Sequence, residues 1–124
     1  MPNKAIKVAI IGSGNIGTDL MHKLHRSNIL ELTWMVGIVA ESEGLRLAQK
    51  LGYNTTHKGI DELIEHANEF DIAFDATTAS AHYRHADILA SSGKLIIDLT
   101  PAAVGPYVVP LVHVSAHLNK TNVN

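Results

Sequence analysis

Apolar residues along the chain fall into two patterns, short unbroken runs and stripes that recur every three or four positions. Unbroken runs are typical of parallel strands covered on both faces, and stripes are typical of helices with one buried face. The runs predict strands over residues 6–11, 32–39, 71–75 and 94–99, and a further apolar run covers 107–114. The short segment over 53–56 is a candidate edge strand. The stripes predict helices over residues 15–27, 43–51, 60–67 and 80–92.

Predicted strands and helices alternate along the chain without an internal repeat. With right-handed crossovers, this order predicts a single α/β domain of the Rossmann-like, doubly wound type with a mainly parallel sheet. A chain of 124 residues fits one such domain, which would bury about two-thirds of the surface of its unfolded chain. Ligands of these sheets bind beyond the carboxyl ends of the strands. We therefore expect the chemistry in the loops over residues 12–17, 39–43, 76–79 and 100–105.

The first of these loops has the sequence Gly12-Ser13-Gly14-Asn15-Ile16-Gly17. In a dinucleotide site Gly12 would permit a tight turn, Gly14 would let the backbone approach a pyrophosphate, and Gly17 would let the helix pack closely on the strand. The free N–H groups and the positive dipole end of the helix would face the phosphates. Glycine-rich turns are common, but the place of this one between a predicted strand and a predicted helix favours a dinucleotide site.

The second loop bears on which dinucleotide is bound. An Asp or Glu about 20 residues beyond the glycines commonly holds the ribose hydroxyls. Glu41 is the candidate for that contact and Ser42 follows it, although a solvated carboxylate opening a helix explains Glu41 equally well. Arg46 lies a turn into the next helix, so no arginine stands at the strand tip to hold a 2′-phosphate. NAD is therefore favoured over NADP.

The third loop is small and rich in hydroxyl groups. Thr77, Thr78 and Ser80 could contact the cofactor or cap the following helix, and a cap accounts for at least one of them. Asp75, at the strand tip, is interpreted as a structural acceptor for N–H groups of the loop rather than as a site carboxylate.

Three pairs of histidines have helical spacing. No cysteine and no His-Glu-x-x-His pattern accompanies them, so we interpret them as solvated helix faces and predict no metal site. His82, just after the hydroxyl-rich loop, is the histidine expected nearest a cofactor. The pairs are His22 with His25, His82 with His85, and His113 with His117.

Composition narrows the function classes further. The net charge is −2 and the ten Lys and Arg residues are scattered, which argues against a nucleic-acid surface. No apolar run is long enough to span a membrane, and the start of the chain leaves no room for a signal peptide, so we expect a cytoplasmic protein. The absence of cysteine excludes disulfides, thiolate metal sites and a thiol nucleophile within these 124 residues.

Several runs of the chain together resemble acylating acetaldehyde dehydrogenase, and the resemblance extends from end to end. The most specific are Gly-Ser-Gly-Asn-Ile-Gly-Thr-Asp-Leu at 12–20 and Asp-Leu-Thr-Pro-Ala-Ala at 98–103. The matching runs cover residues 7–21, 35–38, 74–77, 99–107 and 122–124.

The resemblance implies an enzyme that oxidises acetaldehyde to acetyl-CoA with NAD and coenzyme A. Members of this family pair with 4-hydroxy-2-oxovalerate aldolase, which passes them the aldehyde during the breakdown of aromatic compounds. A cysteine attacks the aldehyde, hydride moves to the nicotinamide, and coenzyme A releases the thioester. The cofactor-binding motif carries over to Ser13, Gly14, Asn15 and Ile16.

The catalytic cysteine of the family does not carry over, because it lies just past the Asn-Val-Asn stretch that ends at Asn124. We expect residues 1–124 to form the NAD(P)-binding domain, truncated before the cysteine segment and the dimerisation domain, and to be inactive alone. Val39 replaces a usual Asp, which weakens the ribose assignment, and Val108 replaces a common Cys. The run over 107–114 could lack partners, giving a marginal fold or self-association.

Three other interpretations remain open at this point. The chain could be a stand-alone NAD-binding or redox-sensing module, or a subunit that docks on the aldolase without catalysis. It could also belong to an oxidoreductase of the semialdehyde or glyceraldehyde-phosphate type, which combines this fold with a cysteine. The Leu-Thr-Pro-Ala-Ala run favours the acetaldehyde enzyme over that last alternative.

Overall fold

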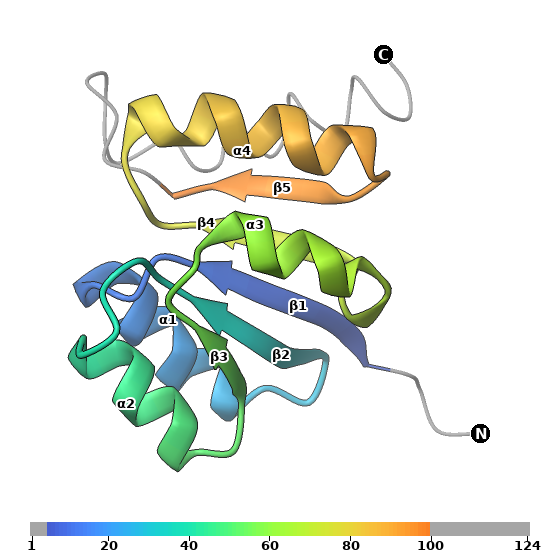
Figure 1. Cartoon of the computed structure of the whole chain (residues 1–124). Helices are drawn as coiled ribbons and strands as arrows, with labels where there is room; N and C mark the ends of the chain where they lie inside the picture. Colours follow the sequence, from blue (N-terminus) through green and yellow to red (C-terminus); the bar gives the residue numbers. More distant parts are fainter. Residues whose placement is uncertain (1–4, 100–124) are drawn as a thin grey trace.

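A computed structural model describes residues 5–99 as one five-stranded sheet with helices on both faces (Figure 1). The strand order is β3-β2-β1-β4-β5, and all four strand pairs are parallel. This is the order of a Rossmann-type sheet with β1 at its centre, so the predicted fold class is confirmed. The elements are β1 (Ile6–Ile11), α1 (Asn15–His25), β2 (Leu30–Val36), α2 (Glu43–Lys50), β3 (Asn54–Thr56), α3 (Ile60–Leu63), the 3-10 helix η1 (Ile64–Glu69), β4 (Ile72–Asp75), α4 (Ala79–Ser91) and β5 (Leu95–Asp98).

Side chains of the central strand point alternately to the two faces of the sheet, and each face has its own core. Val8 and Ile10 pack with apolar residues of α1 and α2, among them Met21. Ala9 and Ile11 pack on the other face with residues of α3 and α4. Burial on both faces explains why the strands appear in the sequence as unbroken apolar runs.

Two predicted boundaries differ from the structure. β2 ends at Val36 instead of at residue 39, because Gly37 N donates to Thr56 O and the chain then turns away from the sheet. The helix predicted over 60–67 is divided into α3 and η1, with non-helical backbone at His66 (φ −116°, ψ 35°). The second difference has a tertiary cause, since Trp34 Nε1 donates to Glu69 Oε1 at 2.8 Å and holds the end of η1 over β2.

The remaining predicted elements agree with the structure to within about two residues at each end, and β3 is the edge strand that the sequence predicts. The further apolar run, over 107–114, lies outside the described residues, as does the expectation of self-association drawn from it. Within residues 5–99, no helix is long and apolar enough to cross a membrane.

The turn after β1 depends on two glycines. Gly12 has φ +117°, which L side chains rarely adopt, and a Cβ there would lie 2.7 Å from Ala76 O. A Cβ on Gly17, in α1, would lie 2.0 Å from Gly12 O. The helix can therefore begin this close to the strand only without side chains at these two positions.

Gly17→Ala should destabilise the fold, because the new methyl group would overlap Gly12 O. Relieving the overlap would require α1 to move away from β1. We expect the free energy of unfolding to fall by about 1–3 kcal/mol, despite the better helix propensity of alanine. Denaturant unfolding measures this change. Gly14→Ala is the matched control, since a Cβ there meets nothing within 4 Å. Equal stabilities of the two variants would contradict this account.

Candidate functional site

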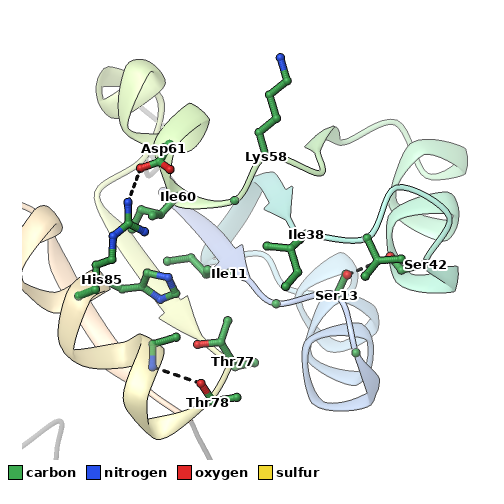
Figure 2. A pocket seen from close by; sticks show the side chains of 18 residues that line it. Ile11, Ser13, Ile38, Ser42, Lys58, Ile60, Asp61, Thr77, Thr78 and His85 are labelled. Atoms are coloured by element: carbon green, nitrogen blue, oxygen red, sulfur yellow. Dashed lines mark hydrogen bonds and ion pairs between the residues drawn. The ribbon is translucent and has the colours of Figure 1, made fainter.

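A cavity of about 560 Å³ lies beyond the carboxyl ends of β1 to β4 (Figure 2). Four segments line it: the glycine turn, the loop from β2 to α2, the loop from β3 into α3, and the loop from β4 with the first turns of α4. The lining residues are Ile11, Gly12, Ser13, Gly14, Gly37, Ile38, Val39, Ser42, Lys58, Gly59, Ile60, Asp61, Ala76, Thr77, Thr78, Ala81, Arg84 and His85.

The start of α1 faces this cavity without a side-chain cap. Its N-cap is Gly14, and the first helical hydrogen bond runs from Thr18 N to Gly14 O at 2.9 Å. By contrast, Ser42 caps α2 and Thr78 caps α4 through their hydroxyl groups. A Cβ on Gly14 would meet nothing within 4 Å, so the protein leaves open space beside this N-cap. The arrangement suits an anion such as a phosphate.

The glycine turn is held against α2 by close contacts around Ser13. Ser42 Oγ donates to Ser13 Oγ at 2.9 Å, which joins the two loops at one end of the cavity (Figure 2). A Cβ on Gly44 would lie 2.3 Å from Ser13 O and 2.6 Å from Thr18 Oγ1, so α2 also approaches closely here. These contacts fix the position of the turn before any ligand binds.

Large apolar side chains form much of the rest of the cavity. Ile38 is 83% exposed and Val39 is 53% exposed on the loop after β2, whereas Ile11 and Ile60 are buried at its floor. Adjacent large apolar side chains that line a pocket are typical of a ligand surface. In Figure 2, Ile38 lies opposite Ile11 and His85.

Charged groups stand at the margin of the cavity. Arg84, from α4, pairs with Asp61, from α3, at 2.6 Å, and both side chains are well exposed. Lys58 extends from the loop after β3. Glu41 is exposed and is not among the residues that line the cavity.

A buried carboxylate underlies the α4 side of the cavity. Asp75 is fully buried, and its Oδ1 accepts hydrogen bonds from the backbone N–H and the hydroxyl of Thr77. Its Oδ2 accepts from His82 Nδ1 at 3.0 Å and from His85 Nδ1 at 2.8 Å. On the opposite edge of the His82 ring, Nε2 lies 3.7 Å from Asp98 Oδ2. The cluster connects β4, α4 and β5.

The hydrogen bonds decide the protonation of this cluster. Burial alone would raise the pKa of Asp75, but the donors His82, His85 and Thr77 outweigh it and hold that pKa well below its usual range. The hydrogen bond to Asp75 raises the pKa of His82 against the effect of burial, and the charge of Asp98 adds to the increase. Both shifts favour the charged pair, an imidazolium of His82 bound to the carboxylate of Asp75.

The interpretation of the second histidine pair as a solvated helix face is wrong. His82 is 8% exposed and His85 is 7% exposed, because the buried carboxylate of Asp75 requires donors that α4 supplies. The prediction that Asp75 accepts from loop N–H groups is confirmed. His22 and His25 are exposed, as predicted, and His25 Nδ1 contacts the hydroxyl of Tyr53. His113 and His117 lie outside the described residues.

Comparison with known proteins gives the family. The family model described as "Semialdehyde dehydrogenase, NAD binding domain" matches residues 7–121. The chain belongs to this family. NAD is accordingly its cofactor, as the sequence predicts.

Curated relatives give the resemblance more precisely. The chain is 59% identical to acetaldehyde dehydrogenase of Brevibacillus brevis, over 98% of this chain and 41% of the relative. It is 58% identical to acetaldehyde dehydrogenase of Geobacillus stearothermophilus, over 96% of this chain and 40% of the relative. The predicted resemblance is confirmed, and the chain spans about two-fifths of the length of these relatives.

A solved structure shares the fold. An NAD-binding protein from Listeria innocua aligns with a TM-score of 0.68 at 19% identity, over 96% of this chain and 34% of that one. At this identity the likeness concerns the fold alone.

Within this member of the semialdehyde dehydrogenase family, the structure brings most of the predicted site residues to one cavity. Gly12, Ser13, Gly14, Ser42, Thr77 and Thr78 line it. Asn15, Ile16 and Gly17 form the first turn of α1. Thr78 caps α4, as the helix-cap alternative predicts, and Thr77 binds Asp75.

Several contributors were missed from the sequence: Ile11, Gly37, Ile38, the segment over 58–61, Ala81, Arg84 and His85. The available signal for His85 is its place seven helical positions into the element that follows the Asp75 strand tip, on the same helix face as His82. The segment over 58–61 follows a short edge strand and carries no motif.

His82→Asn should remove a pH-dependent part of the stability. The raised pKa of His82 means that its pairing stabilises the fold fully below the ordinary value of 6.5 and is lost as pH rises through the folded pKa. We expect a loss of about 1–3 kcal/mol near pH 6, with the difference from wild type shrinking as the pH rises through the folded pKa of His82. Denaturant unfolding of both proteins across this range measures it. A difference independent of pH would count against the charged pair.

Proposed function

We propose that this chain is the cofactor-binding domain of an enzyme that oxidises acetaldehyde to acetyl-CoA with NAD and coenzyme A. The relatives named acetaldehyde dehydrogenase, at 58–59% identity, support the aldehyde as substrate. The coenzyme A step, the pairing with 4-hydroxy-2-oxovalerate aldolase in aromatic breakdown and the cytoplasmic location are part of the proposal on the strength of the sequence resemblance. When bound, NAD supplies the acceptor for the hydride that leaves the aldehyde.

In this proposal the glycine turn binds the pyrophosphate. The backbone N–H groups of Asn15, Ile16 and Gly17 lack a side-chain cap and open toward the cavity past Gly14. This observation carries the assignment, because the two other long helices that start at the same edge of the described sheet are capped by their own hydroxyl groups.

The adenosine half then lies over the end of β2. In this type of fold the ribose sits beside the tip of the second strand, and Ser42 is the hydroxyl that lines the cavity there. Glu41, the carboxylate favoured from the sequence, lies outside the lining, so we assign the ribose contact to Ser42. Thr77 and Thr78 border the cavity on the side of β4. In this proposal the nicotinamide half of the dinucleotide extends past them.

We place the nucleophile outside these 124 residues, since none of them is cysteine. The chain's own residues then have three tasks: they bind the diphosphate, orient the two halves of the cofactor, and exclude water from the apolar wall around Ile38 and Ile11. Carbon–sulfur bond formation with the aldehyde requires a thiolate that they do not provide.

Gly14→Ala should weaken NAD binding without unfolding the chain. A methyl group at this position projects into the open space that the pyrophosphate would occupy, and we expect the dissociation constant to rise by about tenfold or more, equal to about 1.4 kcal/mol. Calorimetric titration of NAD measures the effect. Ser92→Ala, at the far end of α4, is the control for a small substitution and should bind like wild type. Unchanged affinity in Gly14→Ala would rule out a pyrophosphate at this turn.

The 124 residues alone should not turn over substrate. With acetaldehyde, NAD and coenzyme A present, we expect NADH to form no faster than in the buffer blank, because no thiol is available to attack the aldehyde. The acetaldehyde dehydrogenase of Brevibacillus brevis is the positive control under the same conditions. NADH formation clearly above the blank would show that the chain has another nucleophile.

A further inference from the structure

We propose that Nε2 of His85 accepts a hydrogen bond from the amino group of adenine and so makes the site selective for an adenine dinucleotide. This inference rests on the proposed function, because it requires the adenosine half of NAD to lie in the cavity. The observation behind it is a buried imidazole at the wall of an apolar cavity, held in one orientation by a buried carboxylate.

Part of the cavity offers apolar side chains against which a base could pack. Ile38 forms one side and Ile11 and Ile60 form the floor, while His85 from α4 lies on the side opposite Ile38 (Figure 2). With the diphosphate at α1 and the ribose at the tip of β2, the base extends toward this part of the cavity. A planar ring there would bury its faces against aliphatic side chains and bring one edge to His85.

The orientation of the His85 ring is fixed by Asp75. An ionised carboxylate only accepts hydrogen bonds, so the Nδ1 that lies 2.8 Å from Asp75 Oδ2 must carry the proton. With that proton on Nδ1, the neutral form of the ring has an unprotonated Nε2 that accepts. Turning the ring over would break this bond and leave the fully buried carboxylate short of a donor.

Nε2 of His85 is available to a ligand. Among the residues that the structure describes, the ring makes its hydrogen bond through Nδ1, and no buried side-chain nitrogen or oxygen is left without a partner. Nε2 has no partner from residues 5–99, so it is not sealed inside the protein and opens onto the cavity that His85 lines. A hydrogen-bond acceptor is therefore presented at the cavity wall, which also contains the apolar side chains of Ile11 and Ile60.

This acceptor distinguishes adenine from hypoxanthine. Adenine has an amino group at C6 that donates, whereas hypoxanthine has a carbonyl oxygen there that accepts. Nε2 would accept a hydrogen bond from the amino group of adenine, whereas it would face the carbonyl oxygen of hypoxanthine as a second acceptor and be repelled. Nicotinamide hypoxanthine dinucleotide is thus the matched probe, because it keeps the charge, the sugars, the diphosphate and the nicotinamide of NAD.

The experiment measures the ratio of dissociation constants for NAD and nicotinamide hypoxanthine dinucleotide by calorimetric titration. We expect wild type to bind NAD more tightly by about fivefold or more, and His85→Asn to bring the ratio close to one. His82→Asn is the matched control: it removes the other imidazole from the same oxygen of Asp75 but does not touch the cavity. It should keep the wild-type ratio.

Equal affinity of wild type for the two dinucleotides would overturn the inference while leaving NAD binding intact, and this comparison needs no variant to fold. A preference that persists in His85→Asn, or that disappears equally in His82→Asn, would also overturn it, because either result assigns the effect to the packing of α4. Failure of wild type to bind either dinucleotide would overturn the proposed function itself.

Discussion

The buried carboxylate of Asp75 is the interaction on which the cofactor side of this fold depends. An ionised group removed from water costs several kcal/mol unless its acceptor positions are filled. Here the loop after β4 fills one oxygen through Thr77, and α4 fills the other through two imidazoles. The loop and the helix therefore cannot move independently of β4. One wall of the cavity is rigid before any ligand arrives, which lowers the entropy that binding must offset.

At the opposite end of the cavity, the start of α1 has N–H donors that no side chain satisfies. α2 and α4 satisfy their first N–H groups with Ser42 and Thr78, but α1 begins at a glycine that has no side chain to do so. The close approach of Gly17 to Gly12 O then holds this unsatisfied end against the central strand. N–H donors are thus left free at the start of α1, whereas the acceptor oxygens of Asp75 are filled, and this difference suits an anion at the start of α1.

The sequence predicts the fold because strands covered on both faces require consecutive apolar residues. The same rule fails at the end of β2: Ile38 and Val39 continue the apolar run, yet they are exposed at the cavity. Hydrophobicity alone does not distinguish a residue buried in a sheet from one that faces a ligand. The glycine turn was predictable from its motif. His82 and His85 were not, because a helical spacing does not reveal which carboxylate the helix will cover.

The charge distribution around the cavity bears on how NAD is selected. Val39 stands where the family resembled in sequence usually has Asp, and the carboxylate that does line the described cavity, Asp61, is paired with Arg84. In the proposed complex, recognition depends on neutral groups, which are the hydroxyl of Ser42 and the imidazole of His85. Neutral groups discriminate by leaving a buried donor or acceptor unpaired in the wrong complex, not by a long-range field. Their contribution is therefore confined to the atoms they touch and is less screened by salt than that of an exposed ion pair.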